Sequence, residues 1–155
     1  MYKIAVIGAG QLGSRHLQGL KLSKLKSDIW VVDNNSNSLQ IAQQRYEEGE
    51  VNSNQTIYYL QLIEQLPTEL DLVVIATSSK PRLTILKSLL AKVKVTNIIL
   101  EKFLFTGLAD YDEAAQLLQI NHVNAWVNCP RRLFGFYAEI DSMIDKQKPL
   151  VMEYA

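Results

Sequence analysis

Short apolar runs alternate along the chain with longer segments in which leucines recur at helical spacing. The run at residues 4–7 contains no polar residue, and Asp71 is the single polar residue in the run at residues 70–76. A strand with one solvent-facing side alternates apolar and polar residues, so uninterrupted runs indicate strands buried on both faces, as in a parallel sheet. Strands are therefore predicted at residues 4–7, 29–32, 57–60, 70–76, 95–100 and 123–127.

Amphipathic segments separate these runs, and residues with known capping preferences mark their ends. The first segment, residues 11–22, carries Leu12, Leu17 and Leu20 near helical spacing. Pro81 suits the first turn of a later helix, where its missing N–H would have no partner in any case. The other predicted helices run from Ser36 or Asn37 to Gly49, from Thr106 or Gly107 through Leu118, and from about residue 133 to residue 144.

Strands and helices alternate through almost the whole chain. Such alternation implies right-handed crossovers between parallel strands, with helices on both faces of the sheet. The sequence therefore predicts the α/β class: a doubly wound parallel sheet in three α/β/α layers, formed as one domain by residues 1–148.

The numbers of charged, apolar, cysteine and histidine residues exclude several kinds of binding partner. The chain has 155 residues, and its 16 Lys and Arg balance its 16 Asp and Glu, so no net charge attracts nucleic acid or a membrane surface. No segment has the ~20 consecutive apolar residues that span a bilayer. Cys129 is the only cysteine and His16 and His122 are far apart in sequence, so neither a disulfide nor a metal site is predicted. We expect a soluble cytoplasmic protein with a small-molecule partner.

A glycine-rich loop joins the first predicted strand to the first predicted helix. Gly8, Gly10 and Gly13 form the pattern G-x-G-x-x-G. The first glycine allows a sharp turn, the second lets a pyrophosphate approach the backbone, and the third lets helix and strand pack closely. The N–H groups of Gly10, Gln11 and Leu12 would then point at the phosphates from a helix N-terminus. The context favours a Rossmann dinucleotide site over glycines that serve only the turn.

Asp33 predicts which dinucleotide is bound. It ends the second predicted strand, 20 residues after Gly13. A carboxylate there accepts hydrogen bonds from the adenosine ribose hydroxyls and repels a 2′-phosphate. Asn34 and Asn35 bring no positive charge to offset that repulsion. NAD(H) is therefore predicted over NADP(H); the alternative is that Asp33 only starts a turn or caps a helix.

Four segments together resemble one oxidoreductase family. They are residues 7–13 with His16, residues 72–77, residues 100–102 and residues 127–132. The chain resembles the N-terminal domain of the glucose–fructose oxidoreductase and inositol dehydrogenase (Gfo/Idh/MocA-like) family over nearly its whole length. The resemblance implies an NAD-dependent oxidoreductase that transfers hydride between the nicotinamide and a sugar-like secondary alcohol or its ketone.

The resemblance also assigns roles to individual residues. Glu101-Lys102 matches the start of the family's Glu-Lys-Pro motif, so Lys102 is expected beside the nicotinamide as the catalytic residue, with Glu101 in the cofactor site. Thr77 and Ser78 would line the cofactor near its pyrophosphate or nicotinamide ribose. Arg132 is expected near the cofactor, although Arg131 matches the family's arginine equally well. A solvated surface charge is the alternative for Lys102 and for both arginines. His16 is interpreted as a packing or capping residue rather than a base.

Two residues depart from the family pattern near the predicted nicotinamide end. Phe103 replaces the motif's proline, which removes a fixed φ from the backbone beside Lys102. Arg82 stands where the family often has a histidine. These departures leave the glycine loop untouched and bear on the residues that face the substrate.

Members of this family usually continue into an α+β domain that supplies the substrate pocket and most of the oligomer interface. The resemblance implies that residues 149–155 begin that domain, that the chain is a truncated and by itself inactive part, and that the full-length protein is a homo-oligomer. Two alternatives stay open. One is a non-catalytic NAD(H)-sensing or regulatory Rossmann module, and the other is a different two-domain reductase, such as a relative of dihydrodipicolinate or biliverdin reductase.

Overall fold

The computed structural model describes residues 1–144, apart from the side chain of Arg132. Within them, parallel strands form one sheet in the order β3-β2-β1-β4-β5-β6. The strands are β1 (Tyr2–Ile7), β2 (Ser27–Val32), β3 (Gln55–Leu60), β4 (Glu69–Ile75), β5 (Lys94–Glu101) and β6 (Asn124–Asn128). The helices are α1 (Gln11–Lys21), α2 (Ser36–Glu47), α3 (Ser79–Leu90), α4 (Leu108–Ile120) and α5 (Gly135–Met143), with short 3-10 segments η1 (Ile63–Gln65) and η2 (Pro130–Leu133).

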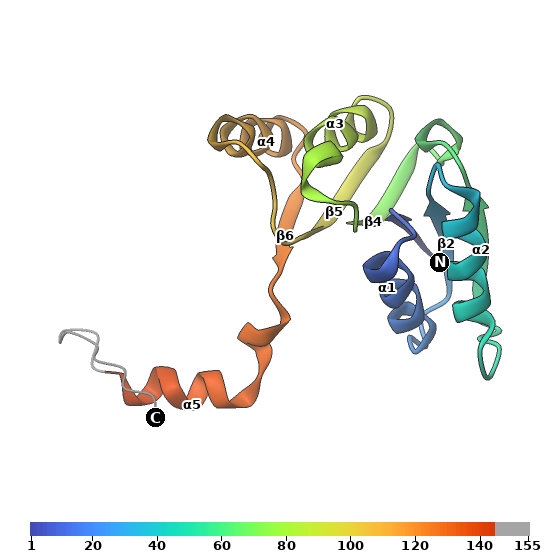
Figure 1. Ribbon diagram of the computed structural model, residues 1–155, viewed down its shortest axis with the longest axis horizontal. Helices are drawn as coiled ribbons and strands as arrows, with labels where there is room; N and C mark the ends of the chain where they lie inside the picture. Colours follow the sequence, from blue (N-terminus) through green and yellow to red (C-terminus); the bar gives the residue numbers. More distant parts are fainter. Residues whose placement is uncertain (145–155) are drawn as a thin grey trace.

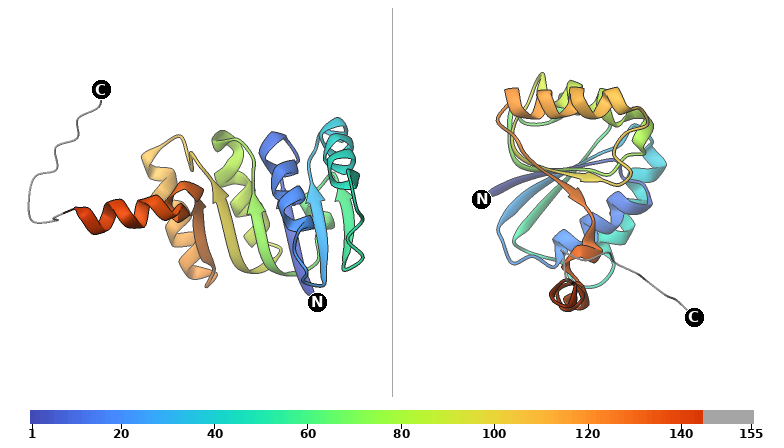
Figure 2. Two further views of the ribbon diagram at one scale, coloured as in Figure 1. Left: turned by 90° about the horizontal axis from the view of Figure 1, so that it is seen from below. Right: turned by 90° about the vertical axis from the view of Figure 1, so that its left-hand side faces the viewer.

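Helices cover both faces of the sheet. α1 and α2 lie on one face and α3 and α4 on the other, so the sheet is the middle of three layers (Figure 1; Figure 2, right). The chain moves outward from β1 to β3, returns to β4 and continues outward on the other side. The strand order therefore reverses between β1 and β4, which is where doubly wound sheets bind their ligands. This arrangement confirms the predicted fold class.

A hydrophobic cluster lies on each face of the sheet. On one face Leu86 of α3 and Ile98 of β5 belong to the same cluster. On the other face Leu17 of α1 joins Ile29 of β2. All four side chains are fully buried, and burial of an aliphatic side chain stabilises a fold by about 1.5–3 kcal/mol. Burial on both sides explains why the strands carry continuous apolar runs rather than alternating ones.

The start of α2 differs from its prediction. Asn35, rather than Ser36 or Asn37, is the N-cap, and its side-chain oxygen accepts hydrogen bonds from the backbone N–H groups of Asn37 and Ser38. All three candidates have capping side chains, so their preferences alone do not separate them. The turn that Asp33 sets at the end of β2 decides between them, because the Asp33 carboxylate accepts a hydrogen bond from the N–H of Asn35.

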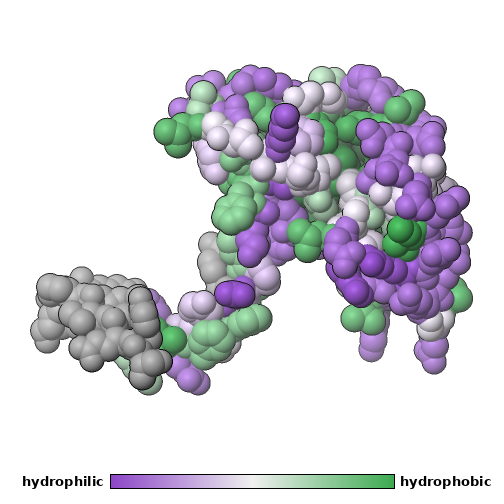
Figure 3. Space-filling view, in the orientation of Figure 1, coloured by the Kyte–Doolittle hydropathy of each residue, from purple (hydrophilic) through white to green (hydrophobic). Residues whose placement is uncertain are grey.

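The last described segment extends away from the body of the domain. β6 is an edge strand, and after it the chain runs through η2 into α5, which projects beyond the sheet (Figure 2, left). Apolar side chains are exposed along this segment (Figure 3); they are Trp126, Leu133, Phe134, Phe136, Tyr137, Ile140 and Met143. The predicted second domain at residues 149–155 lies outside the described residues. In the part that is described, no helix has the length and apolar character needed to cross a membrane.

Candidate functional site

The turn between β1 and α1 requires glycine at two positions. Gly8 has a φ of +94°, and a Cβ there would lie 2.9 Å from the Thr77 backbone nitrogen. A Cβ on Gly13 would lie 1.7 Å from the carbonyl oxygen of Gly8, so a side chain there would push α1 away from the turn. A Cβ on Gly10, by contrast, would meet nothing within 4 Å. Gly10 therefore leaves space that the protein itself does not fill.

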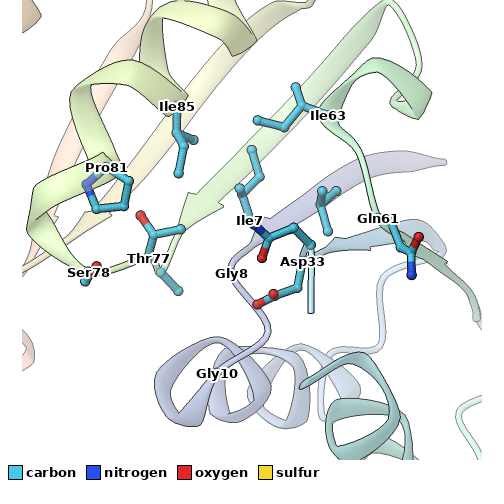
Figure 4. A pocket seen from close by; sticks show the side chains of 13 residues that line it. Ile7, Gly8, Gly10, Asp33, Gln61, Ile63, Thr77, Ser78, Pro81 and Ile85 are labelled. Carbon is cyan, nitrogen blue, oxygen red and sulfur yellow. The ribbon is translucent and has the colours of Figure 1, made fainter. Parts of the chain in front are cut away.

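A cavity of about 400 Å³ opens beside this turn (Figure 4). It lies at the carboxyl ends of β1, β2 and β4, where the strand order reverses. Open α/β sheets bind their ligands at this place. Its lining residues are Ile7, Gly8, Gly10, Val32, Asp33, Asn34, Gln61, Ile63, Ala76, Thr77, Ser78, Pro81 and Ile85.

Asp33 is held at the edge of this cavity by two backbone N–H groups. Its Oδ2 accepts a hydrogen bond of 2.7 Å from Ala9, inside the glycine loop, and its Oδ1 accepts one of 2.9 Å from Asn35. These bonds fix the carboxylate while each oxygen keeps a further lone pair for a ligand hydroxyl. Among the described residues, the cavity lining contains no lysine or arginine that would neutralise the carboxylate or attract a phosphate.

Two further segments of the chain contribute to the cavity wall. Gln61 and Ile63 reach it from the segment after β3, and Pro81 and Ile85 reach it from α3 (Figure 4). Sequence reasoning missed these residues, although their positions just after the ends of β3 and β4 were a usable signal. The hydroxyl of Thr77 is buried and has no hydrogen-bond partner within the described residues, and Thr77 lines the cavity, so this hydroxyl is available to a ligand.

Lys102 and Glu101 follow one another at the end of β5 but have opposite surroundings. The side chain of Lys102 is exposed, whereas Glu101 is 3% exposed. Glu101 Oε1 lies 2.6 Å from His16 Nε2 on α1, and it accepts a hydrogen bond of 2.5 Å from Asn128 Nδ2 at the end of β6. Neither Lys102 nor Glu101 lines the cavity. The structure thus places the Glu101 carboxylate against two protein side chains.

Arg82 holds the loop that follows Glu101. It is 1% exposed, and its guanidinium donates to the carbonyl oxygens of Glu101, Phe103 and Leu104 and to that of Thr77. Burial lowers the pKa of Arg82, and the charge of Glu101 partly offsets that effect. The loop that carries Thr77 and the loop that carries Lys102 are therefore joined by one buried cation. The peptide bond between Lys102 and Phe103, where the family pattern has proline, is cis.

The remaining predicted residues fall into three groups. Gln11 and Leu12 are exposed in the first turn of α1, and Gln11 Oε1 accepts a hydrogen bond from Arg45. Ser78 is an exposed part of the cavity wall. The side chain of Arg132 lies outside the described part of the structure. No group of His, Cys, Asp and Glu side chains suited to a metal ion occurs among the described residues.

Comparison with known proteins identifies the family. Residues 2–129 match the Gfo/Idh/MocA family, described as "Oxidoreductase family, NAD-binding Rossmann fold". No curated protein matches the sequence. Among solved structures, a putative myo-inositol dehydrogenase from Sinorhizobium meliloti 1021 is 16% identical with a TM-score of 0.72, covering 94% of this chain and 41% of its own. The apo scyllo-inositol dehydrogenase from Lactobacillus casei gives the same four values.

A third structure was solved with a dinucleotide. GenD2 from gentamicin A biosynthesis, in complex with NAD, is 16% identical with a TM-score of 0.73, and the match covers 94% of this chain and 39% of that one. The present chain thus spans about two fifths of the length of these three proteins. The family match covers the glycine loop, all six strands and the Glu101-Lys102 pair. The chain therefore belongs to the Gfo/Idh/MocA oxidoreductase family and comprises its NAD-binding Rossmann domain.

Proposed function

We propose that this domain binds NAD(H) in preference to NADP(H) and serves an oxidoreductase acting on a sugar-like secondary alcohol or its ketone. The observation that carries the proposal is Asp33, whose carboxylate is fixed by the glycine loop at the edge of the cavity. The residues present fit such a cofactor on three counts. Gly10 leaves its Cβ position empty, Thr77 has an unpartnered hydroxyl, and the cavity lies at the strand reversal.

The first turn of α1 is the part that would bind the pyrophosphate. Its N-cap is Gly10, which has no side chain to accept hydrogen bonds from the first-turn N–H groups. Such free N–H groups, together with the positive end of the helix dipole, favour an anion. A serine or aspartate at the N-cap would accept hydrogen bonds from these N–H groups with its own side chain. With glycine at the N-cap, a phosphate can accept them instead.

Asp33 would select the adenosine ribose. Two adjacent hydroxyls can each donate to one carboxylate oxygen, and charge-assisted hydrogen bonds contribute about 1.5–3 kcal/mol each. A 2′-phosphate would instead bring negative charge against the Asp33 carboxylate, which no cation among the described lining residues offsets. Ile63 and Val32 supply apolar surface in the same cavity, suited to one face of an adenine ring.

Lys102 would act at the other end of the cofactor. A bound NAD⁺ would supply hydride-accepting chemistry: the alcohol would lose a hydride from its carbon and a proton from its hydroxyl, giving ketone, NADH and one proton. The role of Lys102 would be to orient the substrate oxygen and to hold or release that proton at Nζ. Two of the structural neighbours are named as inositol dehydrogenases, and this supports a polyhydroxylated ring or sugar as the substrate class.

The rest of the active site would come from a second domain. The neighbouring proteins are more than twice as long as the matched region, and Lys102 is exposed and does not line the cavity described above. We therefore propose that residues 1–148 bind NAD(H) without turning over substrate, and that the full-length protein is a homo-oligomer. A purely NAD(H)-sensing module is distinguished by adding inositols to a full-length protein with NAD⁺, because only an oxidoreductase would form NADH.

Calorimetric titration of this chain with NADH and with ADP tests the cofactor site. We expect NADH to bind, and ADP to bind more weakly because it occupies only the adenosine and pyrophosphate positions. The matched variant Gly10→Val would place a side chain where a Cβ on residue 10 has no neighbouring atom within 4 Å. It should lower the affinity of the chain for both NADH and ADP. Absence of heat with NADH, for a chain shown by circular dichroism to be folded, would contradict the proposal.

A further inference from the structure

The carboxylate of Glu101 is buried in this domain but does not line the cofactor cavity. It lies at the end of β5, between α1 and β6, and is 3% exposed. His16 Nε2 and Asn128 Nδ2 both face its Oε1, at 2.6 and 2.5 Å. A carboxylate withdrawn from water costs free energy unless partners replace its hydration. Well-packed apolar side chains in place of a whole buried polar pair often leave stability unchanged or raise it, so such a pair is weak evidence of a role in stability alone.

His16 connects this carboxylate to the glycine loop. It lies in the second turn of α1, the helix whose first turn follows Gly10. The side chain of His16 is 24% exposed and that of Glu101 is 4% exposed, so the contact is partly shielded from solvent. The residues are 85 positions apart in sequence, and the contact therefore joins the helix that faces the pyrophosphate position to the end of β5.

Lys102 is the residue whose place this contact determines. Lys102 is the first residue after the end of β5, so anchoring the side chain of Glu101 fixes the backbone from which the side chain of Lys102 extends. The backbone is anchored as well, because Arg82 donates to the carbonyl oxygens of Glu101 and Leu104 at 2.5 and 2.9 Å. Lys102 thus lies between two fixed points while its own side chain is exposed.

We propose that His16 and Glu101 are positioning residues, which set Lys102 relative to the cofactor from the same helix that binds the pyrophosphate. The inference rests on the proposed NAD(H) site. Asn128 completes the arrangement by holding Glu101 from β6. Loss of the His16–Glu101 contact would leave the phosphate-binding turn intact and would release Lys102 from its place beside the nicotinamide. Substitution of His16 or Glu101 should therefore change the position of Lys102 while the affinity for NADH is largely kept.

Chemical modification of Lys102 tests this separation. The chain is treated with an amine-acetylating reagent with and without saturating NADH, and the extent of modification at each lysine is measured by peptide mass spectrometry. We expect bound NADH to protect Lys102 by about fivefold or more, because a lysine held against a ligand loses reagent access. Lys94, which is exposed at the opposite end of β5, serves as the unprotected control.

Three variants then separate positioning from folding. His16→Leu removes the partner of Glu101, Glu101→Ala removes the carboxylate, and His16→Gln keeps a side-chain N–H donor. We expect NADH affinity within about threefold of the parent in all three, and protection of Lys102 lost in the first two but retained in His16→Gln. Circular dichroism establishes that each variant is folded, so a loss of protection reports on Lys102.

The outcomes distinguish the two proposals. A parent chain that does not bind NADH would refute the proposed function. A parent chain that binds NADH without protecting Lys102 would overturn the positioning inference alone. Full protection of Lys102 in His16→Leu at saturating NADH would also overturn it, since the lysine would then keep its place without the contact.

Discussion

The carboxylate of Asp33 accepts a hydrogen bond of 2.7 Å from the backbone N–H of Ala9, in the middle of the glycine loop. This bond joins the end of β2 to the turn between β1 and α1. The residue proposed to read the ribose is therefore anchored by the loop proposed to bind the pyrophosphate. A carboxylate already held in place loses less conformational entropy when a ligand binds, which favours affinity.

Gly13→Ala should destabilise the domain severely. A Cβ at this position would lie 1.7 Å from the Gly8 carbonyl oxygen, which is backbone and cannot move without opening the turn. Overpacking of this kind costs about 1–3 kcal/mol or more in the free energy of unfolding. Gly19→Ala is the matched control in the same helix, where a Cβ meets nothing within 4 Å. It should stabilise by about 0.5–1 kcal/mol, because alanine is the better helix former. Urea denaturation measures both; equal effects would contradict the packing described for Gly13.

Gly10→Ala should separate binding from folding. The free space around Gly10 accommodates a methyl group, so the expected loss of stability is at most about 1 kcal/mol, from replacing glycine at an N-cap. The same methyl group would occupy the position proposed for the pyrophosphate, and NADH affinity should fall at least about tenfold, equivalent to 1.4 kcal/mol. Calorimetry and thermal unfolding on one preparation provide the two measurements. Unchanged NADH affinity would place the pyrophosphate elsewhere.

Arg82→Met should cost about 3–5 kcal/mol of stability. The substitution leaves the carbonyl oxygens of Thr77, Glu101, Phe103 and Leu104 without the donor that they share, and buried unpaired polar groups are expensive. Lys87→Met, which breaks a pair with Glu113 whose members are 46% and 53% exposed, is the control and should cost less than about 1 kcal/mol. Guanidinium denaturation would contradict this account if the two variants lost equal stability.

Tyr59 should make the fold sensitive to alkaline pH. Burial, with smaller contributions from the charges of Glu47 and Tyr46, raises the pKa of Tyr59 from 10.0 to about 12. The folded state then holds the Tyr59 proton more tightly than the unfolded state does. The contribution of Tyr59 to the free energy of unfolding is therefore complete below pH 10 and is lost as the pH rises to about 12. Tyr59→Phe should show a weaker loss over that interval. Because the Tyr59 hydroxyl is buried with no hydrogen-bond partner among the described residues, this variant should be no less stable at pH 7.

Urea denaturation at pH 8 and at pH 11 measures this difference. Tyr58→Phe is the matched control, since the neighbouring Tyr58 is 41% exposed. Its loss of stability between the two pH values should equal that of the parent chain. The same loss in Tyr59→Phe as in the parent would show that the Tyr59 hydroxyl does not titrate in this range.

The sheet and the glycine loop were predictable because their signals are local. Continuous apolar runs identified the strands, and Gly8, Gly10 and Gly13 identified the turn that their spacing requires. The parallel sheet with helices on both faces followed from the general rules for alternating strands and helices. The helix cap at Asn35 was missed because neighbouring residues had similar capping preferences, and only the turn at Asp33 separates them.

The contacts around Lys102 were not predictable in the same way. His16 and Glu101 are 85 positions apart, and no spacing rule connects two residues at that distance. Arg82 was noticed only as a departure from the family pattern, whereas the structure buries it among four backbone carbonyls. Such contacts depend on how β5 and α1 are brought together in space. They are a property of the folded chain rather than of any short segment.

The most direct test of the cofactor assignment is a parallel calorimetric titration of the parent chain and of Asp33→Ser with NADH and NADPH. We expect the parent chain to bind NADH at least about tenfold more tightly than NADPH, because the 2′-phosphate is repelled by the Asp33 carboxylate. In Asp33→Ser this preference should largely disappear, through weaker NADH binding and relieved repulsion of NADPH. Equal affinities of the parent chain for NADH and NADPH would contradict the role of Asp33.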